Sequence, residues 1–207
     1  MGKSVILVGY SGHGFVAYGI LTAMGKKITG YCETEEKNYN PFLLNYIGKE
    51  LSGEAIRTFH TTDYFISVGS NLIRESIFFA LAQHKLYPIN AVHPSAVIDP
   101  SVQIDPQGIL IAANATINPL VKIGPGVICN TSCSIDHECL IGDFAHIAPG
   151  AVLCGNVTVG SRSFIGANAV IRQGISIGSN VMIGAGSVII TDVPDNSCFI
   201  GNPGKKK

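Results

Sequence analysis

Residues 135–153 read IDHECLIGDFAHIAPGAVL, with an aliphatic residue at every sixth position: Ile135, Ile141, Ile147 and Leu153. The same step covers fourteen positions from Ile111 to Ile189, and none of them is polar. A second series with this step, from Ala115 to Val193, contains only small or aliphatic residues. Two series that share a six-residue step over this length identify an internal repeat.

A six-residue period fits neither an α-helix nor a simple alternating strand. It fits a short strand followed by a corner, so that three units close a triangular coil of about 18 residues. Residues 92–194 then form five to six coils, with one extra residue near Gly108. We predict that the first residue of each unit points inward and that the fifth packs at a crowded corner. We also predict φ > 0 at four corner glycines, which are Gly124, Gly142, Gly160 and Gly178.

Residues 1–88 follow a different pattern from residues 89–207, and we predict two domains with that boundary. Buried strands are predicted over 5–8, 28–31 and 64–68, and helices over 15–24 and 72–84. This alternation is typical of a small α/β unit with a parallel sheet. Residues 34–61 carry no clear pattern.

Three features of the first domain converge on one edge of the predicted sheet. The sequence Gly9-Tyr-Ser-Gly-His-Gly14 opens a helix, where free N–H groups and the helix dipole favour phosphate. Glu33 ends the second strand, where a carboxylate meets ribose hydroxyls in related folds, and Gly69 opens a second loop at the same edge. The sequence therefore predicts a nucleotide site. The alternative is a tight structural turn in a domain that only covers the end of the stacked coils, which together form a β-helix.

Composition excludes several classes of function. Lys plus Arg and Asp plus Glu each number 14, so nothing indicates a nucleic-acid surface or a polybasic membrane anchor. No apolar stretch reaches the ~20 residues of a membrane span, and no signal peptide is evident. The six cysteines form no CxxC pair and suit small buried residues of a reduced, cytoplasmic protein.

Two histidines lie within the repeats but outside the inward positions. His137 is flanked by Asp136 and Glu138, which could hold one tautomer and raise the basicity of the ring. We expect His137 and His146 to be accessible or at an interface. Because they are nine residues apart, they cannot share a face within one coil. A single site using both predicts a contact between subunits, and a three-sided prism packs as a homotrimer. The alternative is an ordinary surface histidine.

Three histidines raise the alternative of a zinc site. His93, His137 and His146 could ligate zinc on a β-helix, but their spacing does not match a known zinc pattern. We expect no metal.

Six stretches carry a resemblance to a known family along nearly the whole chain. They are Gly9–Gly14, Val68–Asn71 with Arg74, Asn130-Thr131, Asp136–Glu138, His146 and Gly201–Pro203. With them the sequence resembles the bacterial sugar O- and N-acyltransferases, which join a Rossmann-like nucleotide-binding domain to a left-handed parallel β-helix. It is most similar to the bacillosamine-type N-acetyltransferases of nucleotide-linked 4-amino-4,6-dideoxy sugars, and it is related to the sialic acid O-acetyltransferases.

The resemblance implies acetyl-CoA as co-substrate and a role in surface polysaccharide or glycan biosynthesis. It implies that His137 is the general base and that Glu138 raises its basicity. His146 would contact the thioester carbonyl, Ala167 and Ala185 would present backbone groups to the pantetheine arm, and Asn130 would line the sugar pocket. The nucleotide would be held by a further group, which is Ser11, Gly12, His13, Glu33, Thr34 and Gly69.

Two other functions compete with N-acetylation. A sugar O-acetyltransferase would use the same histidine as base toward a hydroxyl acceptor. A non-catalytic β-helix, such as an ice-binding or scaffold protein, would need regular Thr ladders, which the repeats lack.

Overall fold

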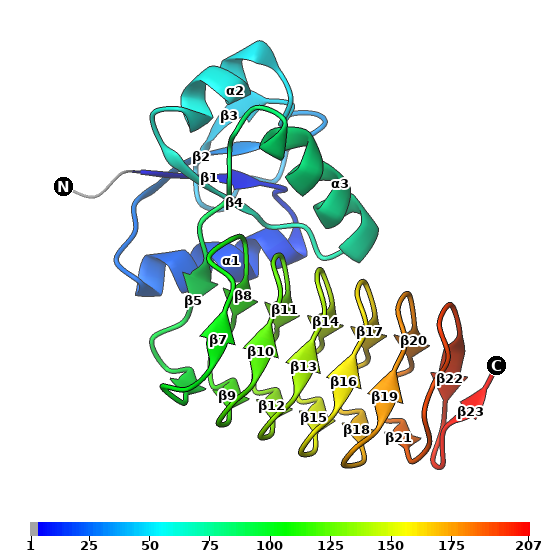
Figure 1. The fold of residues 1–207 in the computed structure, drawn as a ribbon. Coiled ribbons are helices and arrows are strands. Elements are labelled where there is room, and N and C mark those ends of the chain that lie inside the picture. Colours follow the sequence, from blue (N-terminus) through cyan, green and yellow to red (C-terminus); the bar gives the residue numbers. More distant parts are fainter. Residues whose placement is uncertain (1–3) are drawn as a thin grey trace. The chain divides into compact units, whose positions relative to one another are not determined.

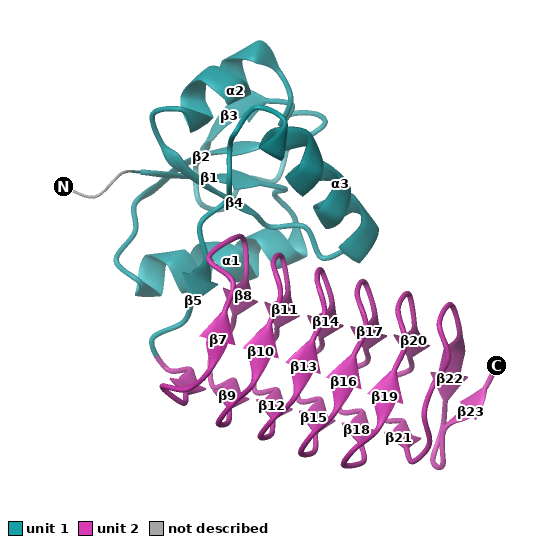
Figure 2. Ribbon diagram, in the orientation of Figure 1, with its two compact units in different colours: residues 1–94 teal, residues 95–207 magenta. Residues whose placement is uncertain are grey.

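The computed structural model describes residues 4–207, which divide into two compact units on either side of the bond between Pro94 and Ser95 (Figure 2). The division falls six residues after the predicted boundary. The additional residues include the short strand β5 (Ala91–Val92), which contacts helix α1 (Gly12–Ala23) of the first unit.

The first unit is a four-stranded parallel sheet with helices between its strands. The strands lie in the order β3 (Asn45–Gly48), β2 (Ile28–Cys32), β1 (Val5–Val8), β4 (Asp63–Ile66). The helices are α1, α2 (Gly53–Phe59) and α3 (Asn71–Ala82). The predicted α/β unit is confirmed. Strand β3 and helix α2 lie within residues 34–61, where no element was predicted.

The second unit is a parallel β-helix whose short strands stack in three sheets, or faces (Figure 1). The first face consists of β7 (Gln103–Ile104), β10 (Lys122–Ile123), β13 (Leu140–Ile141), β16 (Thr158–Val159) and β19 (Ser176–Ile177). The second consists of β6 (Val97–Ile98), β9 (Thr116–Ile117), β12 (Ser134–Ile135), β15 (Val152–Leu153), β18 (Val170–Ile171) and β21 (Val188–Ile189). The third contains β8 (Leu110–Ile111), β11 (Ile128–Cys129), β14 (His146–Ile147), β17 (Phe164–Ile165), β20 (Met182–Ile183) and β22 (Cys198–Ile200).

The register of the strands follows the repeat. Ile123 pairs with Ile141, 18 positions along the chain, whereas Ile104 pairs with Ile123, 19 positions along. The extra residue lies between β7 and β8, where it was predicted. Strand β23 (Lys205–Lys206) turns back and pairs antiparallel with β22.

Both six-residue series are buried, as predicted. No residue of the series from Ile111 to Ile189 or from Ala115 to Val193 exposes more than 4% of its surface. Serine is tolerated in the second series because its hydroxyl is satisfied: Ser163 Oγ donates to the carbonyl of Gly178 and accepts from the N–H of Val181. Burial of such aliphatic side chains drives coil stacking.

The prediction of φ > 0 at Gly124, Gly142, Gly160 and Gly178 is wrong. Left-handed φ values fall two residues later, for example 62° at Arg162 and 55° at Asn180. The glycines are required for a different reason. A Cβ on Gly160 would lie 2.5 Å from the carbonyl carbon of Gly178 and 2.5 Å from the nitrogen of Ser179, in the next coil. Close stacking of backbone on backbone, rather than torsion, selects glycine there.

The structure also bears on membrane insertion. Within residues 4–207, no helix combines the length and apolar character needed to cross a bilayer.

We expect Gly160→Ala to lower the free energy of unfolding by about 1–3 kcal/mol, because the added methyl overpacks a backbone contact. The matched control is Gly174→Asn. Gly174 has φ of 73° and open space around its Cβ position, and the equivalent corner residues Asn156 and Asn168 already adopt such φ values. Urea denaturation of both variants gives the comparison; equal costs would contradict the stacking explanation.

Candidate functional site

A cavity of about 310 Å³ lies in the first unit, at the carboxyl edge of its parallel sheet. Three of the predicted nucleotide residues line it: Ser11, Glu33 and Gly69. Gly12, His13 and Thr34 are not among its lining residues. Open α/β sheets bind ligands at this edge, so the cavity occupies the expected position for a nucleotide.

The glycine turn before α1 is shaped by close contacts. Gly9 has φ of 98°, and a Cβ there would lie 2.7 Å from Val68 Cγ2. A Cβ on Gly14 would lie 2.7 Å from the carbonyl oxygen of Gly9, which also accepts a 2.6 Å hydrogen bond from Ser67 Oγ. Gly12, by contrast, has open space around its Cβ position. Gly9 and Gly14 are therefore required by the fold. The space beside Gly12 is left open by the turn.

Arg74 holds the second loop of the cavity from within the protein. Its guanidinium is 1% exposed and donates to the carbonyls of Val68 (3.0 Å) and Gly69 (3.2 Å) and to Asn71 Oδ1 (2.9 Å). Burial lowers the pKa of Arg74 to about 9, so it stays charged at neutral pH. This cation fixes the loop that carries Gly69.

His13 has an unexpected electrostatic state for a phosphate ligand. Burial, and then the nearby charge of Arg74, lower the pKa of His13 to about 4. The imidazole is therefore neutral at pH 7 and brings no positive charge to an anionic ligand.

Two carboxylates line the cavity, and the sequence predicted only one of them. Glu33 Oε2 lies 3.4 Å from Lys37 Nζ and accepts from the N–H of Tyr10, while its Oε1 accepts from the N–H of Thr34. Thr34 is itself exposed, and here it orients Glu33 through its backbone. Glu50 is the second carboxylate. It follows β3, within the segment that gave no prediction.

His137 lies at the corner between β12 and β13, where its side chain is 46% exposed. Its Nδ1 lies 3.0 Å from Glu138 Oε2. Asp136 Oδ1 accepts hydrogen bonds from the N–H of His137 and from Asn118 Nδ2, and these bonds lower the pKa of Asp136. Asp136 thus fixes the corner, while Glu138, at φ of 61°, faces the ring.

Gly155 makes room for the His137 ring in the next coil. A Cβ on Gly155 would overlap Nε2 and Cε1 of His137, and the three nearest atoms all belong to that imidazole. Gly155 does not have a left-handed φ, so torsion does not demand glycine at this position. Sequence analysis missed this residue, although it lies 18 positions after His137, one coil along in the repeat.

His146 is less accessible than predicted. It is the first residue of β14, is only 7% exposed, and packs edge-on against Phe164. Asn130 Oδ1 accepts from the N–H of Thr131, which turns Asn130 Nδ2 toward His146 Nε2 at 3.1 Å. In the neutral ring, Nε2 is then the acceptor and Nδ1 carries the proton. Asn130 and His146 therefore form one unit, on a different face from His137.

Ala167 and Ala185 lie in one column, at the corner that follows the third face. The carbonyl of Ala167 accepts from the N–H of Gly186. Among the described residues, no protein acceptor takes the N–H of Ala167 or that of Ala185. Two unused backbone donors one coil apart suit the polar groups of an extended ligand.

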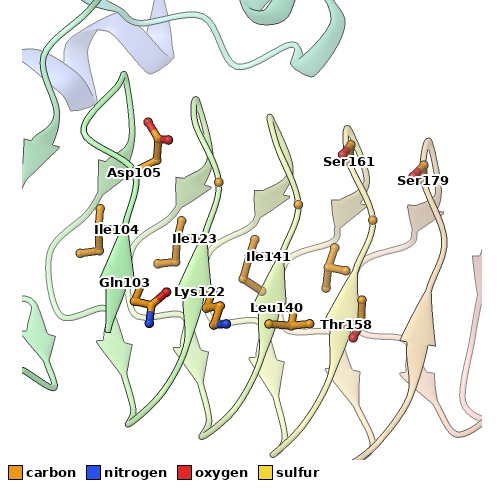
Figure 3. A pocket seen from close by; sticks show the side chains of 14 residues that line it. Gln103, Ile104, Asp105, Lys122, Ile123, Leu140, Ile141, Thr158, Ser161 and Ser179 are labelled. Carbon is orange, nitrogen blue, oxygen red and sulfur yellow. The ribbon is translucent and has the colours of Figure 1, made fainter. Parts of the chain in front are cut away.

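A larger open groove of about 780 Å³ runs along the first face (Figure 3). Gln103, Lys122, Leu140 and Thr158 form a row along it, and Asp105, Ser161 and Ser179 lie near the neighbouring corner. None of the predicted site residues lines this groove. Within residues 4–207, no three His, Cys, Asp or Glu side chains gather as a metal site would require.

Comparison with known proteins agrees with the two-unit architecture. The family described as "PglD N-terminal domain" matches residues 4–81. The family described as "Bacterial transferase hexapeptide (six repeats)" matches residues 138–173 and 156–191. A GDP-perosamine N-acetyltransferase of Escherichia coli O157:H7 is 28% identical over 102 residues, which is 49% of this chain and 46% of that protein. The match therefore spans about half the length of that relative.

Two solved structures match over nearly their whole length. A mutant perosamine N-acetyltransferase from Caulobacter crescentus, in complex with CoA and GDP-perosamine, is 31% identical with a TM-score of 0.93, covering 99% of this chain and 96% of that one. The acetyltransferase domain of PglB from Neisseria gonorrhoeae, in complex with acetyl coenzyme A, is 33% identical with a TM-score of 0.92 and full coverage of both chains. The chain therefore belongs to the sugar N-acetyltransferase family that joins a PglD N-terminal domain to hexapeptide repeats.

Proposed function

We propose that this chain transfers an acetyl group from acetyl-CoA to the amino group of a nucleotide-linked amino sugar, of the 4-amino-4,6-dideoxy class. The observation that carries the proposal is the exposed His137 ring held by Glu138 on a β-helix corner. The relatives support it, because one holds CoA with GDP-perosamine and another holds acetyl coenzyme A. Residues 1–94 hold the nucleotide, and residues 95–207 carry the transfer chemistry.

His137 acts as the general base. A carboxylate only accepts hydrogen bonds, so the 3.0 Å contact with Glu138 places the ring proton on Nδ1 and leaves the lone pair of Nε2 available. The sugar amine attacks the thioester carbonyl carbon, and Nε2 takes the proton that the amine loses. The C–S bond then breaks, and the CoA thiolate leaves and takes up a proton. Glu138 stabilises the imidazolium, and a base of this kind contributes typically 10²–10⁴-fold.

Acetyl-CoA lies along the corner column that contains Ala167 and Ala185. Their unused N–H groups donate to the amide oxygens of the pantetheine arm. His146 contacts the thioester carbonyl, and Asn130 sets its orientation through the 3.1 Å contact with Nε2. Asn130 also faces the sugar.

The active enzyme is a homotrimer with each site at a contact between two subunits. His137 lies at the corner of the first and second faces, whereas His146 belongs to the third face. One β-helix therefore presents the two rings in different directions. A cyclic trimer of prisms brings the corner of one subunit to the third face of its neighbour.

His137→Ala is expected to lower kcat by roughly 10²–10⁴-fold with little change in thermal stability, because the ring is exposed and acts as the base. His84→Ala, at an exposed histidine after α3, is the control and should keep wild-type kcat. Steady-state assays would use acetyl-CoA and a nucleotide-linked 4-amino sugar, with a hydroxyl acceptor tested in parallel. A near wild-type kcat for His137→Ala would contradict the base assignment, and faster transfer to the hydroxyl would favour O-acetylation.

Mixing inactive His137→Ala and His146→Ala subunits tests the shared site. Each mixed trimer contains one interface that combines an intact His137 from one subunit with an intact His146 from its neighbour. We expect part of the activity to return. Native mass spectrometry would confirm that the subunits exchange, and exchanged trimers without activity would contradict this geometry.

Gly155→Ala should displace the imidazole and lower kcat at least about tenfold, since small misplacements of a catalytic group are costly. The variant should also be less stable, because the methyl overlaps the ring. Both effects depend on His137. In a His137→Ala background, the stability cost of Gly155→Ala should disappear, since the overlapping atoms are then absent.

Urea denaturation of the four proteins in this double-mutant cycle measures that coupling. If Gly155→Ala lowers the free energy of unfolding by the same amount with and without the His137 ring, Gly155 is needed for coil stacking and not for the position of the ring.

A further inference from the structure

The cavity of the first unit contains a carboxylate that has no hydrogen-bond or ion-pair partner within residues 4–207. Glu50 lines it and is half-buried. Among the described residues, nothing forms a hydrogen bond or an ion pair with the Glu50 side chain. Glu33, which lines the same cavity, has partners in Lys37, Tyr10 and Thr34. Glu50 is therefore a charged acceptor whose hydrogen-bonding capacity is unused.

The order of the strands indicates which part of a nucleotide meets Glu50. The sheet runs β3-β2-β1-β4, so the edge presents the glycine turn after β1, then Glu33 after β2, then Glu50 beyond β3. Phosphates suit the N-terminus of α1, and a carboxylate after the second strand suits the ribose hydroxyls. The next group outward along the nucleotide is the base. Glu50, beyond β3, is the next residue in the order along this edge.

Electrostatics support the same order. A carboxylate close to a diphosphate would be repelled by it, so neither Glu33 nor Glu50 is suited to the phosphates. Both must instead serve groups that donate hydrogen bonds. The aliphatic side chains of Val68, Ile73 and Ile77 also line the cavity, and they suit the flat apolar faces of a base.

The bases differ in the donors that they offer. Guanine has two adjacent donors, N1–H and the N2 amino group, which match the two oxygens of a carboxylate. Uracil and thymine have a single N3–H between two carbonyl oxygens, and those oxygens face a carboxylate unfavourably. A site that contains a charged acceptor therefore rejects them, because a polar mismatch in a binding site is costly.

We propose that Glu50 selects guanine, so that the nucleotide of the acceptor substrate is GDP rather than UDP or dTDP. This inference rests on the proposed function and adds the identity of the nucleotide. Glu33 holds the ribose, and Glu50 accepts from N1–H and the N2 amino group. Arg74 supports the pair indirectly by fixing the loop of Val68 and Gly69.

Binding of free nucleotides tests the selection without any chemistry. Calorimetry with the full chain should show GDP binding at least tenfold tighter than UDP or dTDP. Inosine diphosphate lacks only the N2 amino group and should bind roughly tenfold more weakly than GDP, the loss expected for one charged hydrogen bond. Equal affinity for GDP and inosine diphosphate, or tighter binding of UDP or dTDP, would overturn the proposal.

A substitution at Glu50 tests its role in binding independently of the other cavity residues. Glu50→Gln keeps the size of the side chain but removes the second acceptor oxygen and the charge. We expect GDP affinity to fall by roughly 10–100-fold while UDP affinity stays the same or rises. Glu54→Gln is the matched control, because Glu54 is an exposed glutamate on the adjacent helix α2 and does not line the cavity. Unchanged GDP affinity in Glu50→Gln would overturn the assignment.

Steady-state kinetics test the choice of base separately from the proposed acetyl transfer. The same 4-amino sugar linked to GDP, UDP and dTDP would be compared by kcat/KM with acetyl-CoA. Faster acetylation of the UDP- or dTDP-linked sugar would overturn the choice of base while leaving the transferase proposal intact. No acetylation of any of the three, with GDP binding as described above, would contradict the transferase proposal and leave the base selection standing.

Discussion

Backbone hydrogen bonds between residues one coil apart place every side chain of the β-helix. The N–H of Asn156 donates to the carbonyl of His137, and the N–H of Glu138 donates to the carbonyl of Pro119. Through such bonds each coil sets the height and direction of the next. The corner that carries His137 is therefore held from both sides before any ligand arrives. A catalytic side chain on such a frame needs few contacts of its own, because its backbone is hydrogen-bonded to the coils on both sides.

The two units position functional groups by different means. In the β-helix, a stacked corner with a left-handed residue, Glu138, aims a carboxylate at the neighbouring ring. In the first unit, loops after parallel strands form the cavity, and loops need a separate support. Arg74 provides it, because its buried guanidinium donates to the carbonyls of Val68 and Gly69. Arg74 does not line the cavity, so it serves the shape of the cavity rather than direct contact.

Sequence alone predicted the features that repeat and missed those that depend on contacts between coils or loops. The six-residue series gave the β-helix and its buried positions, and His137 with Glu138 followed from their neighbours in the chain. Gly155 could not be found this way, because its contact with His137 exists only once coils are stacked. Glu50 lies in a segment without periodicity. Its place at the cavity becomes evident only from the order of the strands in the folded sheet. The burial of His146 depends on Phe164, one coil away, and the trimer stays a prediction.

The antiparallel strand β23 has a consequence for self-association. A stack of parallel coils ends in a strand edge that another molecule could extend, much as a fibril grows by adding layers. Here the chain reverses after β22, and Phe199 and Ile200 pair with Lys206 and Lys205. The reversal breaks the parallel pattern and places exposed ammonium groups at the growing end. On the third face, the reversal therefore leaves no parallel strand edge beyond β22 for another molecule to extend.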